Sequence, residues 1–203
     1  MELVCLDLEG VLIPEIWINF ADRTGIDALR LTTRDIPDYD ELMTRRLGIL
    51  AEHTLGLREI QEVIDGMDPL PGARRFLDAL RESYQLVILS DTFYEFAKPM
   101  MRKLGQPTLL CHRLSVDAGS GRIRDYVLRQ PDPKRQAVLA LKGLNYRVVA
   151  AGDSYNDTTM LAAADAGILF RAPSNVVAEF PQYPTATEYG ELRSLIDRAA
   201  KTA

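Results

Sequence analysis

The first apolar run of the chain and its polar end constrain the fold most. Residues Leu3–Val11 form an apolar stretch that ends in two carboxylates and a glycine. Such a run predicts a short buried strand. Side chains alternate along a strand, so Asp7 and Glu9 face the same way where it ends, and Gly10 lets the chain turn. In open α/β sheets, ligands bind beyond the carboxyl ends of the strands, which predicts a site here. The alternative is a pair of solvated acids at a strand end.

The elements that follow alternate between strands and helices. This order predicts an α/β fold with a doubly wound, mostly parallel, Rossmann-like sheet covered by helices on both faces. The further strands of this core are expected at residues 86–89, 108–110, 146–151 and 166–170.

Two additions to this core are expected. Residues from Pro14 to about Met67 have helical apolar spacing where a βαβ unit needs one crossover helix, which predicts an inserted helical cap. Segments 114–117 and 123–128 flank Gly119-Ser120-Gly121 and predict a β-hairpin. We therefore expect a core domain of residues 1–13 and 70–203, with residues 14–69 forming a cap that closes over a substrate.

Composition limits the partners and the compartment. A net charge of −5 without a basic stripe argues against nucleic acid. No run approaches the roughly 20 apolar residues of a membrane span, and the first residues lead into a strand rather than a signal peptide. Cys5 and Cys111 are interpreted as buried hydrophobic residues rather than a disulfide. A cytoplasmic protein that acts on a small molecule is expected.

Ser90 ends the second predicted strand and is expected to open the helix that runs to about Leu104. There its hydroxyl and the first helical amides could receive an anion, because helix N-termini expose unpaired N–H groups and the positive end of a dipole. An N-cap serine would explain the same residue without a ligand.

Asp153 and Asp157 are predicted on one face at the start of a helix. Like charges four residues apart repel each other unless a cation lies between them or the helix dipole relieves them. Oxygen ligands without His or Cys nearby favour a hard ion such as Mg²⁺ over zinc. The alternative is the ordinary enrichment of acids in a first helical turn.

Lys134 follows Asp132-Pro133 and therefore places a cation in a first helical turn, against the macrodipole. A lysine there could neutralise part of a phosphate, or pair with Asp7 and keep it ionised. The alternative is a lysine that points into water.

Taken together, these groups can perform phosphoryl transfer. An ionised Asp7 would attack phosphorus to give an aspartyl phosphate, while Mg²⁺ and Lys134 offset the charge of phosphate and carboxylates. Ser90 and backbone amides would bind the phosphoryl oxygens. Glu9 would protonate the leaving alkoxide and later take a proton from the incoming water or alcohol.

Four ordered motifs resemble those of the haloacid dehalogenase-like hydrolases, and the similarity covers nearly the whole chain. The cap after the first motif is similar to the phosphoserine phosphatase group, especially its bacterial bifunctional phosphoserine phosphatase and homoserine phosphotransferase members. The motifs are Asp7-Leu8-Glu9-Gly10-Val11, Ser90, Lys134 and Gly152-Asp153-Ser154-Tyr155-Asn156-Asp157.

The resemblance implies roles for these residues. Asp7 would be the nucleophile and Glu9 the general acid and base. Asp7, the Glu9 backbone carbonyl and Asp153 would be the Mg²⁺ ligands. Asn156 and Asp157 would support the metal and the phosphate.

The chain departs from the family at two places. Most of these phosphatases have Asp where this chain has Glu9, and a glycine pair where it has Asp91 and Thr92, which we assign with Ser90 to phosphate or substrate binding. Because Glu is one methylene longer than Asp, its carboxyl need not position water equally well. We hypothesise that Glu9 favours transfer to a bound alcohol over hydrolysis.

For the amino-acid end of a substrate, the resemblance implies Glu15, Tyr39 and Arg46. Tyr39 and Arg46 are seven residues apart and share a helix face with apolar residues. Arg46 could bind a substrate carboxylate in a bidentate manner, and Glu15 could pair with the amine. The alternative is an arginine stem lying over the core, or an internal salt bridge. Four other residues are interpreted as surface or packing residues: Trp17, Arg45, His53 and His112.

The sequence thus predicts a Mg²⁺-dependent phosphatase of O-phospho-L-serine, with water or homoserine as the acceptor. One alternative is a phosphatase of another small phosphate ester in the same superfamily. A second is a non-enzymatic phospho-acceptor switch of the response-regulator type, which has no use for a cap. The oligomeric state is left open, with a homodimer as one option.

Overall fold

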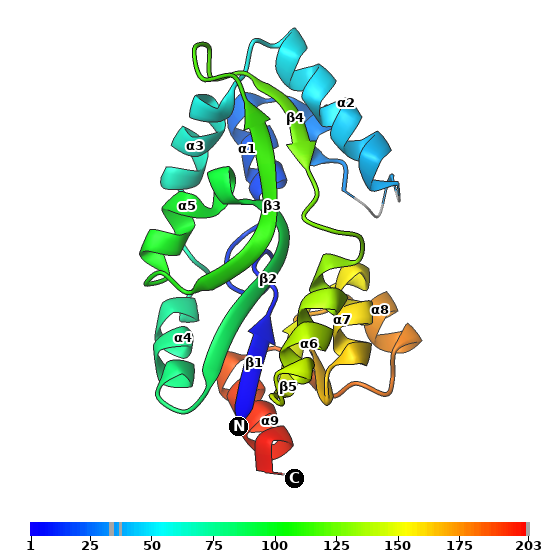
Figure 1. The fold of residues 1–203 in the computed structure, drawn as a ribbon. Helices are drawn as coiled ribbons and strands as arrows, with labels where there is room; N and C mark the ends of the chain where they lie inside the picture. Colours follow the sequence, from blue (N-terminus) through cyan, green and yellow to red (C-terminus); the bar gives the residue numbers. More distant parts are fainter. Residues whose placement is uncertain (33–34, 37, 202–203) are drawn as a thin grey trace.

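A single sheet organises the chain. The computed structural model describes residues 1–32, 35–36 and 38–201. Within them the strand order is β4-β3-β2-β1-β5-β6-β7, parallel throughout except for the antiparallel β3–β4 pair. The strands are β1 Glu2–Leu6, β2 Gln85–Phe93, β3 Thr108–Val116, β4 Ile123–Val127, β5 Arg147–Gly152, β6 Ala166–Phe170 and β7 Thr185–Ala186. The predicted doubly wound α/β fold is confirmed (Figure 1).

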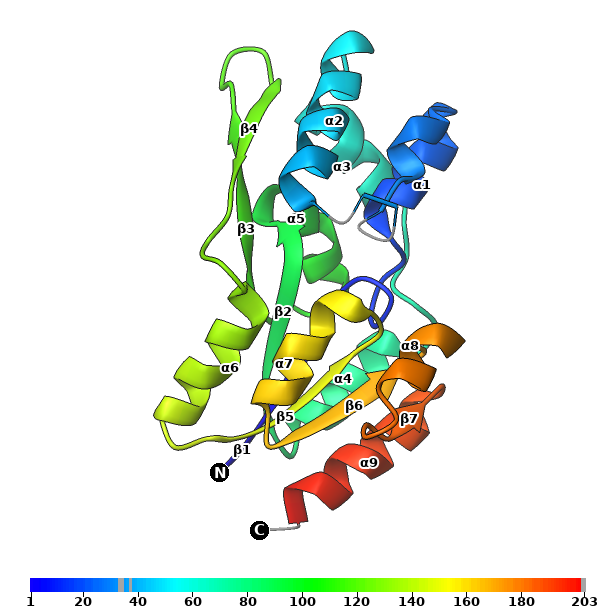
Figure 2. The ribbon, with the colours of Figure 1, turned by 90° about the vertical axis from the view of Figure 1, so that its right-hand side faces the viewer.

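Helices cover both faces of this sheet. Helices α4 Ala73–Arg81, α5 Tyr94–Lys103 and α9 Tyr189–Lys201 pack on one face. Helices α6 Pro133–Gly143, α7 Thr158–Ala163 and α8 Ser174–Glu179 pack on the other (Figure 2). The first strand shows why both faces are apolar: Val4 and Leu6 join the first core cluster, whereas Leu3 and Cys5 join the second.

The cap region lies at one end of the sheet. It comprises α1 Ile16–Thr24, the short 3₁₀ helix η1 Asp27–Arg30, α2 Tyr39–Glu52 and α3 Leu57–Asp65. Figures 1 and 2 show these helices grouped at the end of the molecule where β3 and β4 form their hairpin, and α2 contacts β4. Backbone Leu57 N–H donates to Gly121 O at 3.0 Å, so the turn of the predicted hairpin contacts the cap at the start of α3. The division of the chain at residues 13/14 and 69/70 stays a prediction.

Two predicted boundaries were wrong. Strand β2 continues to Phe93, so the segment Ser90–Thr92 lies on a strand, and α5 begins only at Tyr94. Strand β3 is continuous over Thr108–Val116, where two separate strands were expected. The reason is tertiary: β2 pairs with the first part of β3 and β4 with its last part, so one long strand serves both partners.

Two smaller expectations concern the cysteines and the membrane. Both Cys5 and Cys111 are unpaired and buried, as predicted. In the part of the chain that the structure describes, no helix is long and apolar enough to cross a bilayer.

The topology places a ligand site at the end of β1. This strand lies between β2 and β5. After β1 the chain adds β2, β3 and β4 on one side of it, and then crosses over to add β5, β6 and β7 on the other side. Such a switch point opens a crevice beyond the carboxyl ends of the strands. Asp7 follows β1 and Asp153 follows β5, so both reach this crevice.

Candidate active site

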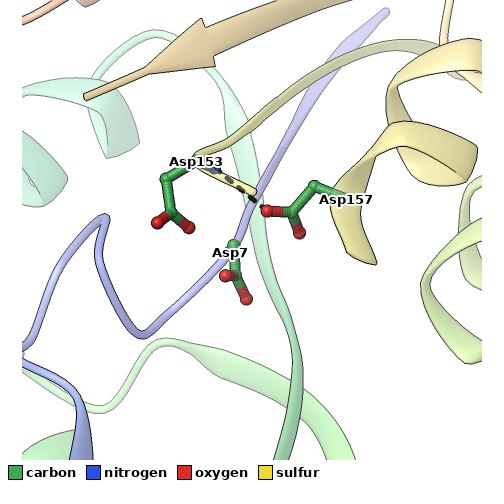
Figure 3. A group of neighbouring side chains, drawn as sticks. All are labelled: Asp7, Asp153 and Asp157. Carbon is green, nitrogen blue, oxygen red and sulfur yellow. Dashed lines mark hydrogen bonds between the residues drawn. The ribbon is translucent and has the colours of Figure 1, made fainter. Parts of the chain in front are cut away.

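Three carboxylates meet at the switch point. Asp7, Asp153 and Asp157 are all buried, and each offers an oxygen within 4.8 Å of an oxygen of the others. Figure 3 shows the three carboxylates close together, with Asp7 lying between Asp153 and Asp157 in this view. Asp7 N–H donates to Ala151 O at 3.0 Å, which continues the β1–β5 pairing by one residue and fixes the start of this arrangement.

Gly10 makes room for this cluster. Its φ of +77° lies in the left-handed region that side chains disfavour. A Cβ at this position would lie 2.5 Å from Asp153 Oδ2. The glycine that was predicted to let the chain turn therefore also allows the first loop to approach the carboxylate of Asp153.

Asp157 is held by the loop that it closes. Its Oδ2 accepts hydrogen bonds from Asp153 N–H at 3.0 Å and Ser154 N–H at 3.2 Å. Asp153 therefore lies in a tight turn before the 3₁₀ helix η2 Tyr155–Asp157, and not on one helix face with Asp157. The predicted helical spacing was wrong, because Asp157 caps the backbone of the turn itself.

Lys134 is the cation of the cluster. It is 3% exposed, and its Nζ donates to Asp157 Oδ1 at 2.7 Å and Asp7 Oδ1 at 2.9 Å. Asp91 Oδ2 lies 3.4 Å from the same nitrogen. The alternative of a solvated lysine does not apply. Burial would lower the pKa of Lys134, but the charges of these three carboxylates together raise it well above its ordinary value.

One lysine faces an excess of negative charge. Burial and the neighbouring Asp157 raise the pKa of Asp7, and Lys134 opposes this rise. Asp7 Oδ1 is taken by Lys134, but no donor reaches its Oδ2 among the described residues. A divalent cation bound by carboxylate oxygens would neutralise this cluster and favour ionised Asp7. The donor set, without His or Cys, fits a hard ion.

The segment Ser90–Thr92 lines a cavity that also contains Asp7, Asp153 and Lys134 in its walls. Ser90 is 4% exposed, and its Oγ accepts a hydrogen bond from Thr92 N–H at 3.2 Å. Neither a helix N-cap nor helical amides are present here, because α5 begins after Phe93. The pairing of β2 with β3 is irregular between Leu89 and Phe93, as in a bulge, which exposes this segment to the cavity.

Asp91 connects this segment with its surroundings. Its Oδ2 accepts from Asn156 Nδ2 at 2.9 Å, and its backbone oxygen accepts from Tyr39 Oη at 3.2 Å. Burial would raise the pKa of Asp91, but Lys134, His112 and Asn156 lower it below its ordinary value. Asp91 is therefore ionised beside the lysine.

The cavity joins the acidic cluster to the cap. It has a volume of about 600 Å³ and is lined at one end by Asp7, Ser90 and Lys134. Glu9 and Glu15 also line it, and they form a second group with Arg46, because the charges that act on Glu9 are those of Glu15 and Arg46. Glu9 Oε2 accepts from Ile16 N–H at 2.9 Å, which fixes it at the start of α1. Burial and the charge of Glu15 raise the pKa of Glu9 to about 8, so this carboxyl carries a proton near neutral pH.

Arg46 lies at the cap end of the cavity with unused hydrogen-bonding capacity. It is 7% exposed, its Nη2 donates to Leu31 O at 2.7 Å, and its guanidinium lies 4.4 Å from the Trp17 ring centroid. Its Nε is a buried donor without a partner among the described residues. Burial lowers the pKa of Arg46 to about 10, which Glu9 partly offsets. An orphaned buried donor is costly, so this group suits a ligand.

The structure brings the predicted residues into one cavity. All of the predicted site residues except Asp157 line it, and Asp157 lies directly behind Lys134. Sequence reasoning missed two groups. Trp17 packs in the core, as predicted, but it also lines the cavity against the Arg46 guanidinium. His112 is buried, and its imidazole faces Asp91. The alternation along β3 could have placed His112 inward, but nothing local indicates its partner.

Comparisons with known proteins agree with this geometry. The family model for haloacid dehalogenase-like hydrolases matches residues 1–165. The phosphoserine phosphatase ThrH of Pseudomonas aeruginosa is 66% identical over 95% of this chain and 94% of its own length. A phosphoserine phosphatase of Pseudomonas syringae pv. tomato is 63% identical over 98% and 84%. A solved phosphoserine phosphatase with a phospho-aspartyl intermediate analogue shares the fold, with a TM-score of 0.77 at 18% identity over 96% of this chain and 98% of that chain.

Proposed function

Because the chain belongs to the haloacid dehalogenase-like hydrolase family, we propose that it hydrolyses O-phospho-L-serine through an aspartyl phosphate. The resemblance read from the four motifs is confirmed. The observation that supports phosphoserine as the substrate is that the cavity has two chemically different ends. One end has carboxylates and a lysine that suit phosphoryl transfer, and the other has an orphaned arginine donor beside Glu15.

The first half-reaction forms a bond between an Asp7 oxygen and phosphorus. Asp7 Oδ2, which no protein donor occupies among the described residues, is the oxygen suited to attack. The bond between phosphorus and the serine oxygen breaks, and the electron pair leaves with that oxygen. The protonated Glu9 donates its proton there, so serine leaves as a neutral alcohol.

The second half-reaction reverses these roles. Glu9, now a carboxylate, takes a proton from water as the water oxygen bonds to phosphorus. The bond between phosphorus and Asp7 breaks, which restores the carboxylate and releases inorganic phosphate. Lys134 and the segment Ser90–Thr92, which line this end of the cavity, stabilise the negative oxygens of the transferring group at both steps.

The cluster at the end of β1 suits Mg²⁺. We assign Asp7, the Glu9 backbone carbonyl and Asp153 as ligands, with Asp157 in support, because both oxygens of Asp157 already accept protein donors. When bound, the ion supplies positive charge that lets a phosphate dianion approach these carboxylates.

The amino-acid end of the substrate would lie under the cap. Arg46 offers its orphaned Nε–H to the substrate carboxylate, and Glu15 faces the ammonium group. Tyr39 closes the cavity by its hydrogen bond to Asp91 O. A substrate that lacks the carboxylate leaves the Arg46 donor unpaired, which favours a phosphorylated amino acid over other small esters.

A bound alcohol is a second acceptor that this site could use. Glu9 is fixed by Ile16 N–H close to Glu15 and Arg46, so the proton-transfer group lies beside the amino-acid end. Homoserine carries the same ammonium and carboxylate as serine and one more methylene before its hydroxyl. We therefore propose homoserine as an alternative acceptor in place of water.

A panel of phosphate esters tests the function. With Mg²⁺, we expect steady release of phosphate from O-phospho-L-serine and phosphorylated homoserine when homoserine is added. Asp7→Asn should abolish both while the circular dichroism spectrum and unfolding temperature stay near those of the wild type. A single stoichiometric phosphorylation without turnover would instead favour the phospho-acceptor switch, and a faster rate on an ester without the carboxylate would favour another substrate.

A further inference from the structure

His112 is a buried polar residue for which the proposed chemistry has no role. It lies on β3 with 3% of its surface exposed. Its Nδ1 accepts a hydrogen bond from Arg129 N–H at 3.1 Å. A neutral imidazole that accepts at Nδ1 carries its proton on Nε2. The hydrogen bond therefore assigns the tautomer with an Nε2–H donor.

That donor faces Asp91. His112 Nε2 lies 3.6 Å from Asp91 Oδ1, slightly beyond a direct hydrogen bond. The other oxygen of Asp91 faces Asn156 and Lys134, at 2.9 and 3.4 Å. One carboxylate thus lies between a buried imidazole on one side and two groups of the phosphate end on the other.

The segment that carries Asp91 needs such contacts. Pairing of β2 with β3 is regular up to Leu89↔Leu110 and is next found at Phe93↔His112. Four residues of β2 therefore span two of β3, and Ser90–Thr92 leaves the ladder. The sheet does not fix this segment, so side-chain contacts must do so.

Asp91 would harm phosphate binding if it turned freely. It is ionised and lies on the segment Ser90–Thr92, which lines the phosphate end of the cavity. A carboxylate directed toward the phosphoryl oxygens repels them. Contacts that direct it toward Asn156, Lys134 and His112 remove this repulsion.

We propose that His112 is a positioning residue that holds Asp91 and thereby fixes the phosphate-facing segment Ser90–Thr92 together with Lys134 and Asn156. The proposal rests on the phosphatase function proposed above. His112 does not itself line the cavity: its imidazole faces Asp91 and packs against the rings of Tyr39 and Phe93, which do line it. Its influence on the site passes through these neighbours, of which Asp91 is the charged one.

Two substitutions test separately the hydrogen-bonding roles of the two imidazole nitrogens of His112. In His112→Asn, the shorter side chain keeps an acceptor near Arg129 N–H and withdraws the donor from Asp91. In His112→Gln, the longer side chain keeps a donor toward Asp91. We expect kcat to fall roughly tenfold or more in the Asn variant and to stay within about threefold in the Gln variant. Tyr84→Phe, which removes a hydrogen bond to Asp197 away from the cavity, is the control and should leave kcat unchanged.

The type of loss distinguishes positioning from a general structural effect. Because the phosphate end serves every substrate, His112→Asn should lower kcat equally on O-phospho-L-serine and on an aryl phosphate, with little change in KM. In an Asp91→Ala background it should cause no further loss. An undiminished kcat, a loss confined to KM on phosphoserine, or full additivity with Asp91→Ala would each overturn the proposal.

A second measurement needs no turnover. The chain has two histidines, and His53 is exposed, so the nitrogen NMR spectrum of histidine-labelled protein contains an internal control. We expect His112 as the Nε2–H tautomer, with a resonance that Asp91→Ala shifts while that of His53 stays. An Nδ1–H tautomer, or an unchanged signal, overturns the proposal even if His112→Asn does not fold. If the wild type releases no phosphate from any ester, the proposed function fails, and this spectrum still decides the contact.

Discussion

Removing Arg46 tests the amino-acid end of the cavity most directly. Arg46→Ala deletes the guanidinium of a residue that is 7% exposed, and the Nε of this group has no partner among the described residues. In the proposed complex this donor and a second N–H bind the substrate carboxylate. The substitution should therefore affect carboxylate-bearing substrates more than others.

The size of the effect follows from the number of hydrogen bonds. A hydrogen bond to a charged group contributes about 1.5–3 kcal/mol. Two such bonds at the lower value give about 3 kcal/mol, which corresponds to a fall in kcat/KM on the order of a hundredfold. Arg46 also packs over Trp17 and lies near Glu9, so part of any loss will be shared by all substrates.

A comparison of two substrates cancels the part of the loss in kcat/KM that all substrates share. O-phosphoethanolamine has the phosphate and the amine of O-phospho-L-serine but no carboxylate. The ratio of kcat/KM for the two esters should fall roughly a hundredfold in Arg46→Ala. Arg45→Ala, the exposed neighbour on the same helix, should leave the ratio unchanged. Equal losses on both esters, in protein with a wild-type unfolding temperature, would refute the assignment of Arg46 to the carboxylate.

Three further predictions concern the phosphate end and its loop. Gly10→Ala should lower kcat roughly a hundredfold, because its Cβ displaces Asp153, whereas Gly25→Ala carries the same left-handed strain with open space around it and should affect only the unfolding temperature. Chelation should abolish phosphate release and Mg²⁺ restore it. Mg²⁺ at a hundred times its Kd should stabilise the wild type by about 2.7 kcal/mol and Asp153→Asn much less, as measured by thermal unfolding. Glu9→Asp should lower the ratio of transfer to hydrolysis roughly tenfold in a phosphate-partition assay with homoserine, and an unchanged ratio would contradict its role in acceptor choice.

Much of the fold could be predicted because its signals are local. The apolar run before Asp7 and the alternation of later elements specify a doubly wound sheet and its site edge. Lys134 could be singled out because a cation in a first helical turn violates a local rule, and its three carboxylate partners explain the violation.

The remaining features depend on contacts between distant segments. Ser90 looks like a helix cap in the sequence, but β3 extends the pairing of β2 past it. Asp153 and Asp157 have helical spacing, yet the backbone amides of their own turn decide the conformation. His112 resembles any inward residue of a strand, because its partner Asp91 comes from another strand. Long-range pairing of this kind leaves little trace in local periodicity.

The position of Trp17 has a practical consequence. It is the single tryptophan of the chain, and it lines the cavity with the Arg46 guanidinium against its ring. Indole emission depends on nearby charge and solvent, so a carboxylate that draws Arg46 toward itself will alter the intrinsic fluorescence of the protein. The enzyme thus carries its own optical probe of ligand occupancy, and titrations need neither a label nor a turnover signal.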